Sequence, residues 1–403
     1  MHVVLGAYLL SGTPGYRQAG IHQYSRALIE HLALEETALP GPLTVLISPS
    51  ARNQLNGLRV AGANITVRTA SRSTETPWQR IWVEQIETPR LLRPIKEALY
   101  HGLAFVAPLR APCPTVITVH DLSFITRPQT HKPLNRLYLS LFTHWSCRRA
   151  TRLIAVSEWT RRDIVRWLNI NSEQIEVIPH GVHARFRPLP EQEVAAFKRQ
   201  HAISDRAIFF LGSLEPRKNL TTLIEAFAMI HSRTENGGGE EKATEERGAN
   251  QAQLILGGAP AWKYEPIFAR VKALALESRV RLIGPIAQEA LPAWYNACAV
   301  FAYPSLYEGF GLPVLEAMAC GAPVVASNVT SLPEVVGDAG LLIDPLDVRG
   351  WAEALGGLLN APERRQALRA ASLRRAAAFT WQAAAAHTLK TYVDAWQAGA
   401  RRL

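Results

Sequence analysis

Residues 303–316, YPSLYEGFGLPVLE, hold side chains and glycines of the kinds that bind phosphates and hydroxyl groups. Proline is tolerated in the first turn of a helix, where its missing N–H would have no partner, so a helix should begin at Leu312 or Pro313. Glu308 then lies in the loop before this helix, and Glu316 lies within about one turn of its N-terminus. The spacing therefore predicts two carboxylates close to one helix start.

The glycines of this loop indicate what it could bind. Gly309 and Gly311 let the backbone approach a ligand closely, and the free N–H groups of a helix start bind anions such as phosphate. Carboxylates beside such a site suit the hydroxyl groups of a sugar or a ribose, so one segment could hold both halves of a nucleotide sugar. The alternative is a glycine turn with solvent-facing carboxylates, and it stays open here because the full GxGxxG pattern is absent.

A basic pair follows another expected strand, in residues 210–220, FLGSLEPRKNL. Arg217 and Lys218 could meet a diphosphate there, since Arg binds phosphate in bidentate geometry and Lys acts as a compact point charge. The alternative is a basic pair on an exposed turn. Residues 12–28 give a corresponding glycine-containing loop between the first expected strand and the first helix, so either sheet could offer backbone amides to a ligand.

Three further polar residues come directly after expected strands: His120, Ser157 and His180. A histidine at the carboxyl end of a strand is placed for a role in a cleft, but a lone histidine is equally often a hydrogen-bonded structural residue. Both interpretations of His120 stay open. For Ser157 and His180, a local role in turns is favoured over catalysis.

The elements that must position these residues alternate between short apolar runs and helical periods. Expected strands lie at 3–10, 43–47, 115–119, 153–156 and 175–178, and then at 207–211, 253–256, 280–283, 300–303, 323–326 and 340–343. Expected helices lie at 21–34, 135–149, 160–168, 220–231, 264–276, 291–296, 314–319 and 348–359. Strands that are apolar without alternation are typical of parallel sheets buried on both faces. The rhythm predicts an α/β protein with two doubly wound sheets in series, whose ligands bind beyond the carboxyl ends of the strands, in a cleft between the two domains.

The domain boundaries follow from breaks in this rhythm. The join should lie in 182–205, where RFRPLP interrupts the pattern. We expect an N-terminal Rossmann-like domain at 1–185 and a C-terminal one at 186–380, followed by a helix at 381–403. Residues 233–251 contain three consecutive glycines, many charges and no large apolar side chain, so they predict a flexible surface loop.

Composition excludes several classes of protein. The 403 residues are 48% hydrophobic and 19% charged, which suits two domains with proper cores and excludes general disorder. Every apolar stretch is interrupted well before the roughly 18 residues of a membrane-spanning helix, and the opening MHVVLGAYLL is interpreted as a strand rather than a secretory signal. The four cysteines form no CxxC pair, which argues against a structural zinc site and suits a reducing cytosol.

The net charge of +10 is concentrated in the first half of the chain. Residues 1–185 hold 21 Lys and Arg against 12 Asp and Glu, so they carry +9 of the total. Such an excess favours an anionic partner, either an anionic membrane surface or a phosphorylated substrate; an arginine-rich solvated surface is the alternative. Nucleic acid is not expected, because no zinc-finger, RNP-type or basic-zipper pattern is present.

Taken in order, these motifs resemble those of a known family. Gly20-Ile21 before the first helix, His120-Asp121, VSEWT, VIPHGV, GSLEPRKNL, YEGFGLPVLEAMACGAPVVAS and GDAGLLIDP look like the retaining nucleotide-sugar glycosyltransferases of glycosyltransferase family 4. The resemblance spans nearly the whole chain, and 233–251 looks like an insertion. It implies the GT-B architecture, in which two Rossmann-like doubly wound domains face each other across a cleft.

The resemblance also implies roles for individual residues. The donor would bind mainly to the second domain and the acceptor mainly to the first, with the C-terminal helix packing back on the first domain. The catalytic residues would be Glu308, Lys218 and His120. The donor-binding residues would be Arg217, Ser213, Gly212, Phe310, Gly311, Leu312, Glu316 and Gly20. Among them, Glu316 would bind the ribose hydroxyls and Gly20 would approach the diphosphate.

In the same resemblance, Lys218 would stabilise the diphosphate as it leaves, and Glu308 would contact the transferred sugar near His120. No metal and no further cofactor are expected, because basic residues and helix-start amides take the charge that Mg²⁺ would carry. The leaving phosphate would accept the proton of the acceptor on the same face. Two departures affect phosphate binding: Ser213 stands where many relatives carry Arg, so binding would fall to Arg217 or to Lys218 alone, and Ala19 replaces the first of two glycines.

The function expected from this resemblance is hexosyl transfer, with mannose from GDP-mannose as the best candidate, to a glycan or lipid-linked acceptor in polysaccharide or glycolipid biosynthesis. We expect a cytoplasmic protein, with peripheral association at the inner face of the cell membrane. Transfer to a small soluble acceptor is one alternative. A non-catalytic nucleotide-sugar-binding partner subunit is another, but a degenerate copy would have no need to keep Glu308, Glu316 and Lys218 together.

Overall fold

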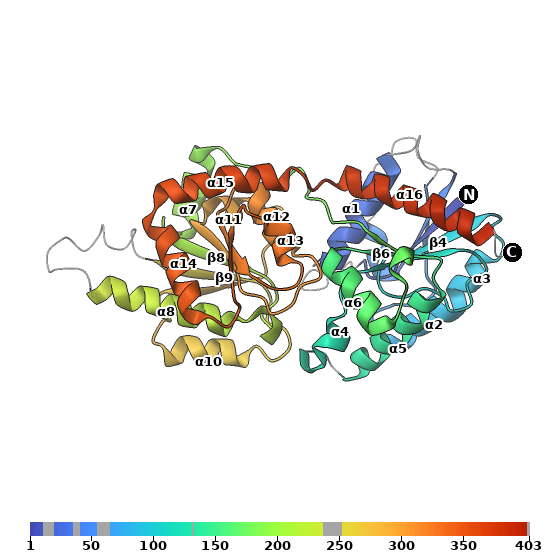
Figure 1. Cartoon of the computed structure of the whole chain (residues 1–403), viewed down its shortest axis with the longest axis horizontal. Helices are drawn as coiled ribbons and strands as arrows, with labels where there is room; N and C mark the ends of the chain where they lie inside the picture. The colour runs from blue at the N-terminus through green and yellow to red at the C-terminus, as the bar shows by residue number, and fades with distance from the viewer. Residues whose placement is uncertain (11–19, 35–40, 55–64, 131–132, 237–251, 401–403) are drawn as a thin grey trace. The chain divides into compact units, whose positions relative to one another are not determined.

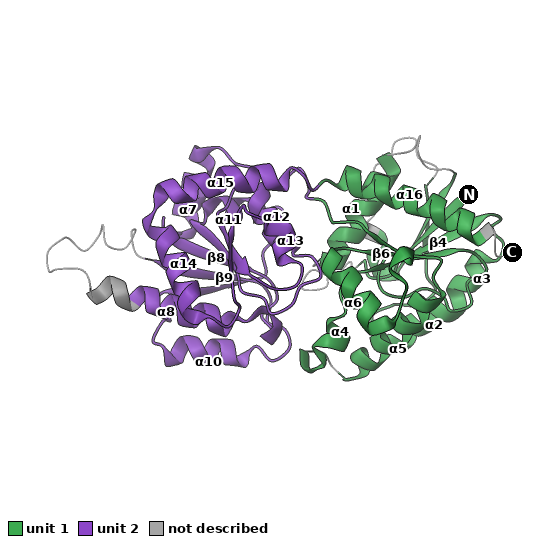
Figure 2. Cartoon of the chain, viewed as in Figure 1, with its two compact units in different colours: residues 1–181, 380–403 green, residues 182–379 purple. Residues whose placement is uncertain are grey.

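The computed structural model divides the chain into two compact units. It describes residues 1–10, 20–34, 41–54, 65–130, 133–236 and 252–400. Unit 1 comprises Met1–Gly181 together with Thr380–Leu403, and unit 2 comprises Val182–Phe379 (Figure 2). The divisions thus fall one to four residues before those expected at 185/186 and 380/381.

Unit 1 is built on a parallel sheet with the strand order β3-β2-β1-β4-β5-β6-β7 (Figure 1). The strands are β1 (His2–Ala7), β2 (Leu43–Ile47), β3 (Ile65–Thr69), β4 (Ala98–Gly102), β5 (Thr115–Val119), β6 (Arg152–Ala155) and β7 (Ile175–Val177). The side chains of β2, β4 and β5 are buried throughout, as expected for strands covered on both faces. Strand order reverses between β1 and β4, which are direct neighbours.

Helices connect these parallel strands. They are α1 (Gly20–Leu34), α2 (Pro77–Trp82), a π-helical turn (Val83–Glu87), α3 (Thr88–Leu92), α4 (Ser123–Thr126), α5 (Pro133–Arg149), α6 (Glu158–Leu168) and, from the far end of the chain, α16 (Trp381–Ala400), with short 3-10 turns at Pro49–Gln54, Pro128–Thr130 and Ser172–Gln174. Helix α6 begins where the Ser157 hydroxyl accepts a hydrogen bond from the Thr160 N–H, and it ends at Asn169 in the left-handed conformation. Ser157 is therefore a helix cap, in keeping with the local role favoured from sequence.

Unit 2 repeats the plan with the strand order β10-β9-β8-β11-β12-β13. Its strands are β8 (Ala207–Leu211), β9 (Gln253–Gly257), β10 (Val280–Gly284), β11 (Val300–Tyr303), β12 (Val324–Ser327) and β13 (Leu341–Ile343). Its helices are α7 (Glu191–His201), α8 (Leu220–Asn236), α10 (Glu265–Ala273), α11 (Leu291–Ala297), α12 (Leu312–Ala319), α13 (Leu332–Val336), α14 (Val348–Asn360) and α15 (Pro362–Ala376). All strand pairs of both sheets are parallel among the residues described, so the α/β class expected from sequence is confirmed.

Helix α16 completes unit 1 by packing against α1 and touching β5 and β6. Its buried side chains include Trp381, Leu389 and Tyr392. The Tyr392 hydroxyl lies 2.7 Å from Nδ1 of the buried His101, whose Nε2 lies 2.8 Å from the Thr118 hydroxyl. The last helix is thus joined to the first sheet by apolar packing and by a buried hydrogen-bond chain.

Most expected elements are present, and the differences are local. The loop expected to begin at 233 is wrong at its start, because α8 continues to Asn236; residues 237–251, like the glycine loop before Gly20, lie outside the described residues. Strands β3 and β4 and helices α2, α3, α4, α13 and α15 were not expected from sequence. No helix within the described ranges has the length and apolar character needed to cross a membrane.

Candidate active site

The candidate site of unit 2 lies where β8 and β11 end. These two strands are neighbours at the point where strand order reverses, and ligands of doubly wound sheets bind beyond the carboxyl ends of strands at this point. After β8 the chain forms a 3-10 turn at Pro216–Lys218, and after β11 it forms the loop that carries Glu308. The two segments singled out from sequence, residues 210–220 and 303–316, are therefore brought together.

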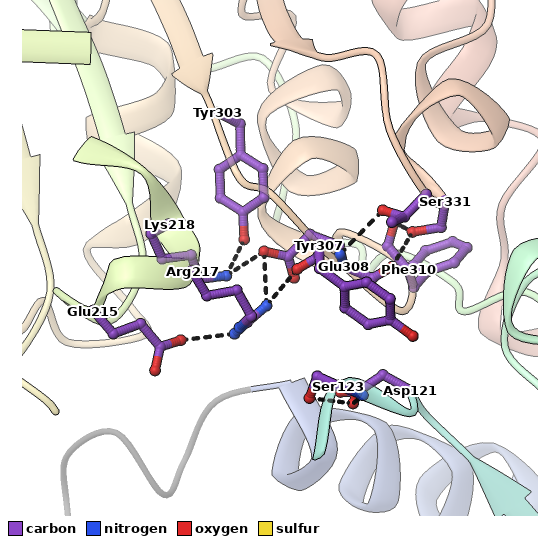
Figure 3. Close-up of polar contacts among 11 residues, drawn as sticks. Asp121, Ser123, Glu215, Arg217, Lys218, Tyr303, Tyr307, Glu308, Phe310 and Ser331 are labelled. Carbon is purple, nitrogen blue, oxygen red and sulfur yellow. Dashed lines mark hydrogen bonds and ion pairs between the residues drawn. The ribbon is translucent and has the colours of Figure 1, made fainter. Parts of the chain in front are cut away.

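Lys218 and Glu308 form a buried ion pair (Figure 3). The Lys218 Nζ atom lies 2.5 Å from Glu308 Oε1 and donates a second hydrogen bond of 2.7 Å to the Tyr303 hydroxyl. Only 5% of Lys218 and 8% of Glu308 is exposed. The alternative of a solvent-facing basic pair and carboxylate is therefore wrong for these two residues, whose side chains are aimed at each other.

Arg217 contacts the same carboxylate oxygen (Figure 3). Its Nη1 atom lies 3.1 Å from Glu308 Oε1 and donates a 2.7 Å hydrogen bond to the Tyr307 carbonyl, while Nη2 lies 2.8 Å from Glu215 Oε1. Two cations thus converge on one carboxylate oxygen. The cluster gathers the charges that a diphosphate and a sugar would each require.

The charges of this cluster control one another. Burial alone would raise the pKa of Glu308, but the Arg217 and Lys218 cations outweigh it and bring that pKa down to about 2. Burial and the neighbouring Arg217 lower the pKa of Lys218, while Glu308 and Glu215 oppose this shift. Glu308 is therefore a carboxylate throughout the physiological range, held in place by two cations.

Residues between β12 and α13 hold the Glu308 loop in position. The Thr330 hydroxyl accepts a 3.1 Å hydrogen bond from the Glu308 N–H. The Ser331 hydroxyl lies 3.0 Å from the Glu308 carbonyl and 2.9 Å from the Phe310 carbonyl, both of which accept (Figure 3). The phenyl ring of the buried Phe310 packs edge-on against Phe379. These contacts hold the loop backbone in position.

Two glycines are required by this geometry. Gly311 has a φ of +107° at the start of α12, and a Cβ there would lie 2.8 Å from a methyl group of Leu332. Gly212 follows β8, and a Cβ there would lie 2.9 Å from the Phe210 ring and 3.4 Å from Cε of Lys218. Helix α12 begins at Leu312, as expected, so its first N–H groups follow directly on Gly311.

Glu316 lies on α12, apart from the ion-pair cluster. Its Oε2 atom accepts a 2.9 Å hydrogen bond from the Tyr295 hydroxyl of α11, and only 9% of the residue is exposed. Burial raises the pKa of Glu316 to about 7, although the Tyr295 hydrogen bond and the charge of Arg185 oppose the shift. Glu316 therefore differs from Glu308 in that its charge changes near neutral pH.

His120 belongs to unit 1, directly after β5. Its Nε2 atom lies 2.8 Å from the Leu103 carbonyl, which can only accept, so Nε2 carries the proton. Nδ1 has no hydrogen-bond partner among the described residues. Burial lowers the pKa of His120 to about 4, and Tyr24 and Phe105 pack edge-on against its ring. At neutral pH the ring therefore offers an uncharged acceptor nitrogen.

The remaining residues singled out from sequence have simpler surroundings. Gly20 is the exposed first residue of α1, and no atom lies within 4 Å of an added Cβ, so nothing in the described part of unit 1 demands glycine there. Ser213 follows Gly212 in the chain and is half-buried. His180 is buried, with its ring stacked on Trp381.

Comparison with known proteins identifies the chain. Residues 192–375 match the family model described as Glycosyl transferases group 1, and residues 94–186 match the model described as Glycosyltransferase Family 4. The O-antigen chain mannosyltransferase B of Escherichia coli is 33% identical over 302 residues, which cover 75% of each chain. The chain belongs to glycosyltransferase family 4.

Solved structures agree on the fold of this glycosyltransferase. Sucrose-phosphate synthase from Thermosynechococcus elongatus superposes with a TM-score of 0.75 at 21% identity, covering 98% of each chain. The crystal structure of Anabaena Alr3699/HepE in complex with UDP-glucose gives a TM-score of 0.71 at 19% identity, covering 97% of this chain and 99% of that chain. The expected GT-B fold is therefore confirmed.

Several residues of the glycosyltransferase site were missed from sequence. Tyr303 binds Lys218, Glu215 pairs with Arg217, and Tyr295, Thr330 and Ser331 hold the two glutamates or their loop. Glu215 lies in the same EPRKN segment as Arg217, so its proximity could have been noticed. The others come from distant segments, and no local sequence signal connects them to the site.

Proposed function

We propose that this glycosyltransferase transfers mannose from GDP-mannose, with retention of anomeric configuration, to a glycan or lipid-linked acceptor in polysaccharide or glycolipid assembly. The observation that carries the proposal is the convergence of Lys218, Arg217 and Glu308 at the ends of β8 and β11. The name of the E. coli O-antigen mannosyltransferase supports mannose and a polysaccharide product. Alr3699/HepE, solved with UDP-glucose, supports a nucleotide-sugar donor.

In the proposed reaction, Lys218 and Arg217 bind the donor diphosphate. The bond between the sugar C1 and the diphosphate oxygen breaks, so positive charge develops on the ring and negative charge on the leaving group. Cations that are already fixed near the phosphate stabilise this charge without reorganisation. Many relatives carry an Arg at the position of Ser213. Arg217 lies beside Lys218, and this supports Arg217 as the replacement for that missing Arg.

The carboxylates act on the hydroxyl groups of the donor. Glu308 is ionised and fixed by its loop, so it accepts hydrogen bonds from the transferred sugar. The amides of Phe310, Gly311 and Leu312 contribute N–H groups at the start of α12. Glu316 accepts hydrogen bonds from the ribose, for which its carboxylate form is required.

The acceptor hydroxyl attacks C1 on the face from which the diphosphate leaves, and its proton passes to an oxygen of that leaving phosphate. No side chain is then needed as a base. His120 contributes an uncharged imidazole whose Nδ1 accepts a hydrogen bond from a substrate hydroxyl. The diphosphate approaches the first turn of α1 at Gly20, which is exposed. NMR of the product tests retention, since an inverted anomeric centre would contradict it.

The central test is Lys218→Met, which keeps most of the apolar stem and removes the charge. We expect kcat to fall by about 10² to 10³, the usual effect of losing one preorganised electrostatic contact. Tyr303→Phe is the matched control, because it removes a charge-assisted hydrogen bond to Lys218 but leaves the cation. It should therefore lower kcat less than Lys218→Met does. Unchanged turnover in Lys218→Met would remove this residue from the mechanism.

Donor identity and metal requirement are tested separately. GDP and GDP-mannose should raise the melting temperature more than UDP, ADP and their sugars do, because a ligand that binds only the folded state stabilises it. We propose that no metal and no further cofactor take part, so EDTA should leave the transfer rate unchanged. A UDP-selective shift, or activity that EDTA removes and Mg²⁺ or Mn²⁺ restores, would contradict these parts of the proposal.

A further inference from the structure

Helix α5 (Pro133–Arg149) of unit 1 exposes its large apolar side chains to solvent. Leu134, Leu137, Leu141 and Trp145 are 70%, 58%, 49% and 49% exposed. Their spacing of three, four and four residues places them on one side of the helix, along about 16 Å. Helix α5 lies along the lower edge of unit 1 in Figure 1. We refer to these four residues as the α5 stripe.

The buried residues of α5 are not its most apolar ones. Its fully buried residues are Tyr138, Thr143, Ser146 and Cys147, with Leu139 and Phe142 partly buried beside them. Tyr138 donates a 2.5 Å hydrogen bond to Glu84, and Ser146 bonds to the backbone of Ala107. A surface helix normally places its apolar residues toward the core and its polar ones toward water. In α5 four large apolar side chains are exposed instead, so burial in the core does not explain the stripe.

The charges on α5 are all of one sign. The helix, PLNRLYLSLFTHWSCRR, contains no Asp or Glu, and Arg136, Arg148 and Arg149 are exposed. The Arg149 guanidinium lies 5.6 Å from the centre of the Trp145 ring. In the neighbouring α6, the acidic residue Glu158 pairs with Arg161. An apolar stripe therefore faces solvent beside exposed arginines, on a helix that contains no acidic residue.

We propose that the α5 stripe and its arginines form a docking surface for an anionic membrane. Apolar side chains of an interfacial helix enter the boundary between headgroups and acyl chains, while arginines contact anionic headgroups. Tryptophan is enriched at the membrane interface because its ring is apolar and its N–H is polar. This surface gives the lipid-linked acceptor of the proposed function a physical route to unit 1, but the docking itself does not depend on which sugar is transferred.

Charge favours a membrane over a protein partner. An anionic bilayer presents a continuous negative surface, which complements a helix that has exposed arginines near both ends and no acidic residue. Protein interfaces are also enriched in Trp and Arg, so the preference for a membrane rests on the uniform positive charge of the helix. The Arg149 cation lies over the Trp145 ring, so charge and apolar surface occur at the same point of the helix. The boundary between lipid headgroups and acyl chains likewise brings charged and apolar groups together.

The test is vesicle sedimentation of the full chain. Vesicles of phosphatidylglycerol mixed with phosphatidylcholine should bind the protein at low salt, and vesicles of phosphatidylcholine alone should bind it more weakly. Leu141→Glu should weaken binding at least about tenfold, because an apolar contact becomes a repelled carboxylate. Each change of Arg148 or Arg149 to Gln should weaken it about fivefold and reduce the salt dependence.

Leu34→Glu is the matched control, since Leu34 is a more exposed leucine of the same unit and the substitution introduces the same charge. It should bind vesicles as the natural chain does. Equal losses in both variants, or no binding of the natural chain to anionic vesicles, would overturn the proposal. A concentration-dependent dimer that Leu141→Glu abolishes, without any vesicle binding, would assign the stripe to self-association instead.

Nucleotide thermal shifts on the same variants keep the two proposals separate. Leu141→Glu and Leu34→Glu should melt with the same shift in the presence of GDP, because neither residue belongs to the candidate active site. Loss of vesicle binding with an unchanged nucleotide shift supports the docking surface alone. If no nucleotide shifts the melting temperature of any variant, this result counts against the proposed function. The vesicle result would then stand by itself.

Discussion

The ion pair between Lys218 and Glu308 stabilises the fold and, in the proposed function, takes part in transfer. A single substitution would affect both. Removing one partner of a buried pair leaves an uncompensated charge, which costs about 3 to 5 kcal/mol. Arg217 also contacts Glu308, so the carboxylate keeps one cation when Lys218 is changed. The reverse does not hold, because Glu308 is the carboxylate that both cations share.

We therefore predict that Glu308→Ala lowers the free energy of unfolding by about 3 to 5 kcal/mol, in addition to its effect on transfer. Glu308→Gln should cost less, because its amide oxygen still accepts from Lys218. Urea unfolding measures both. Glu215→Ala is the control, since Glu215 also pairs with Arg217 but is more exposed. Equal stability of Glu308→Ala and Glu215→Ala would contradict the assignment of the buried pair.

The raised pKa of Glu316 predicts a pH dependence of folding stability that is opposite in sign to that from Glu308. The pKa of Glu316 is raised by burial to about 7, so the folded chain keeps a proton that the unfolded chain releases near its usual value of 4.5. The stability from this proton is complete below the unfolded value and is lost as pH rises through about 7. Between about pH 5 and 8 the natural chain should lose about 2 kcal/mol that Glu316→Gln does not lose.

Unfolding curves at several pH values test this prediction, with Glu353→Gln as a control on the exposed side of α14. Donor affinity should change in the other direction. Since the ribose hydroxyls need the carboxylate as acceptor, nucleotide binding should strengthen as pH rises through 7, and Glu316→Gln should flatten this profile. Parallel profiles for the natural chain and Glu316→Gln would show that Glu316 does not titrate there.

At the scale of elements, the start of α12 is the most constrained backbone of the site. Gly311→Ala would force a side chain into a φ of +107° and against Leu332, so we predict a loss of about 1 to 3 kcal/mol of stability and weaker nucleotide binding. Gly357→Ala, within α14, has no atom within 4 Å of the new Cβ. It should be stabilising by about 0.5 to 1 kcal/mol. Thermal melts of the two variants should move in opposite directions; if they move together, the strain argument fails.

The sequence predicted elements well where burial on both faces leaves a continuous apolar run. The expected limits of β8, β11, β2 and β5 agree with the structure to the residue. β3 was missed because it is an edge strand whose side chains are largely exposed, so ITVRT has no apolar run. β4 is buried, but ALYHG contains a His and a Gly that interrupt the pattern.

The same limit applies to helices and to the site. α15 buries only Ser372 and Ala376 completely, so it has no apolar period to detect. Lys218 and Glu308 could be singled out because each lies in a dense local motif. Their pairing, and the roles of Tyr303 and Ser331, depend on strand order, because β8 and β11 are separated in the chain by two other strands. The residues of the site that lie in local motifs could thus be predicted from the sequence. Most of their hydrogen-bond and ion-pair partners could not.

At the scale of the whole molecule, unit 2 is an insertion into unit 1. The chain leaves unit 1 after Gly181 and returns at Thr380, and a Cβ on Gly181 would lie only 2.1 Å from the Trp381 nitrogen. Within unit 2, the Val182 N–H donates a 3.1 Å hydrogen bond to the Phe379 carbonyl. The two ends of the insertion are therefore adjacent.

This connectivity predicts how fragments behave. Residues 182–379 contain the complete second sheet and the Lys218, Glu308 and Glu316 cluster, so this fragment should fold alone and show a thermal shift with nucleotide. Residues 1–181 should not fold alone, because α16 covers part of their core. Joining 181 to 380 through a short glycine linker should restore folding. Circular dichroism distinguishes these outcomes, and a stably folded 1–181 fragment would contradict the role of α16.

The position of α16 also sets an order of events during protein synthesis. The first 181 residues leave the ribosome without the helix that covers α1, and roughly 220 further residues must be made before it emerges. At about 5 to 20 residues per second, this delay lasts on the order of 10 to 40 s. Unit 2 can complete its fold within that interval, whereas the nascent unit 1 keeps apolar surface open to chaperones or to aggregation until α16 has been made.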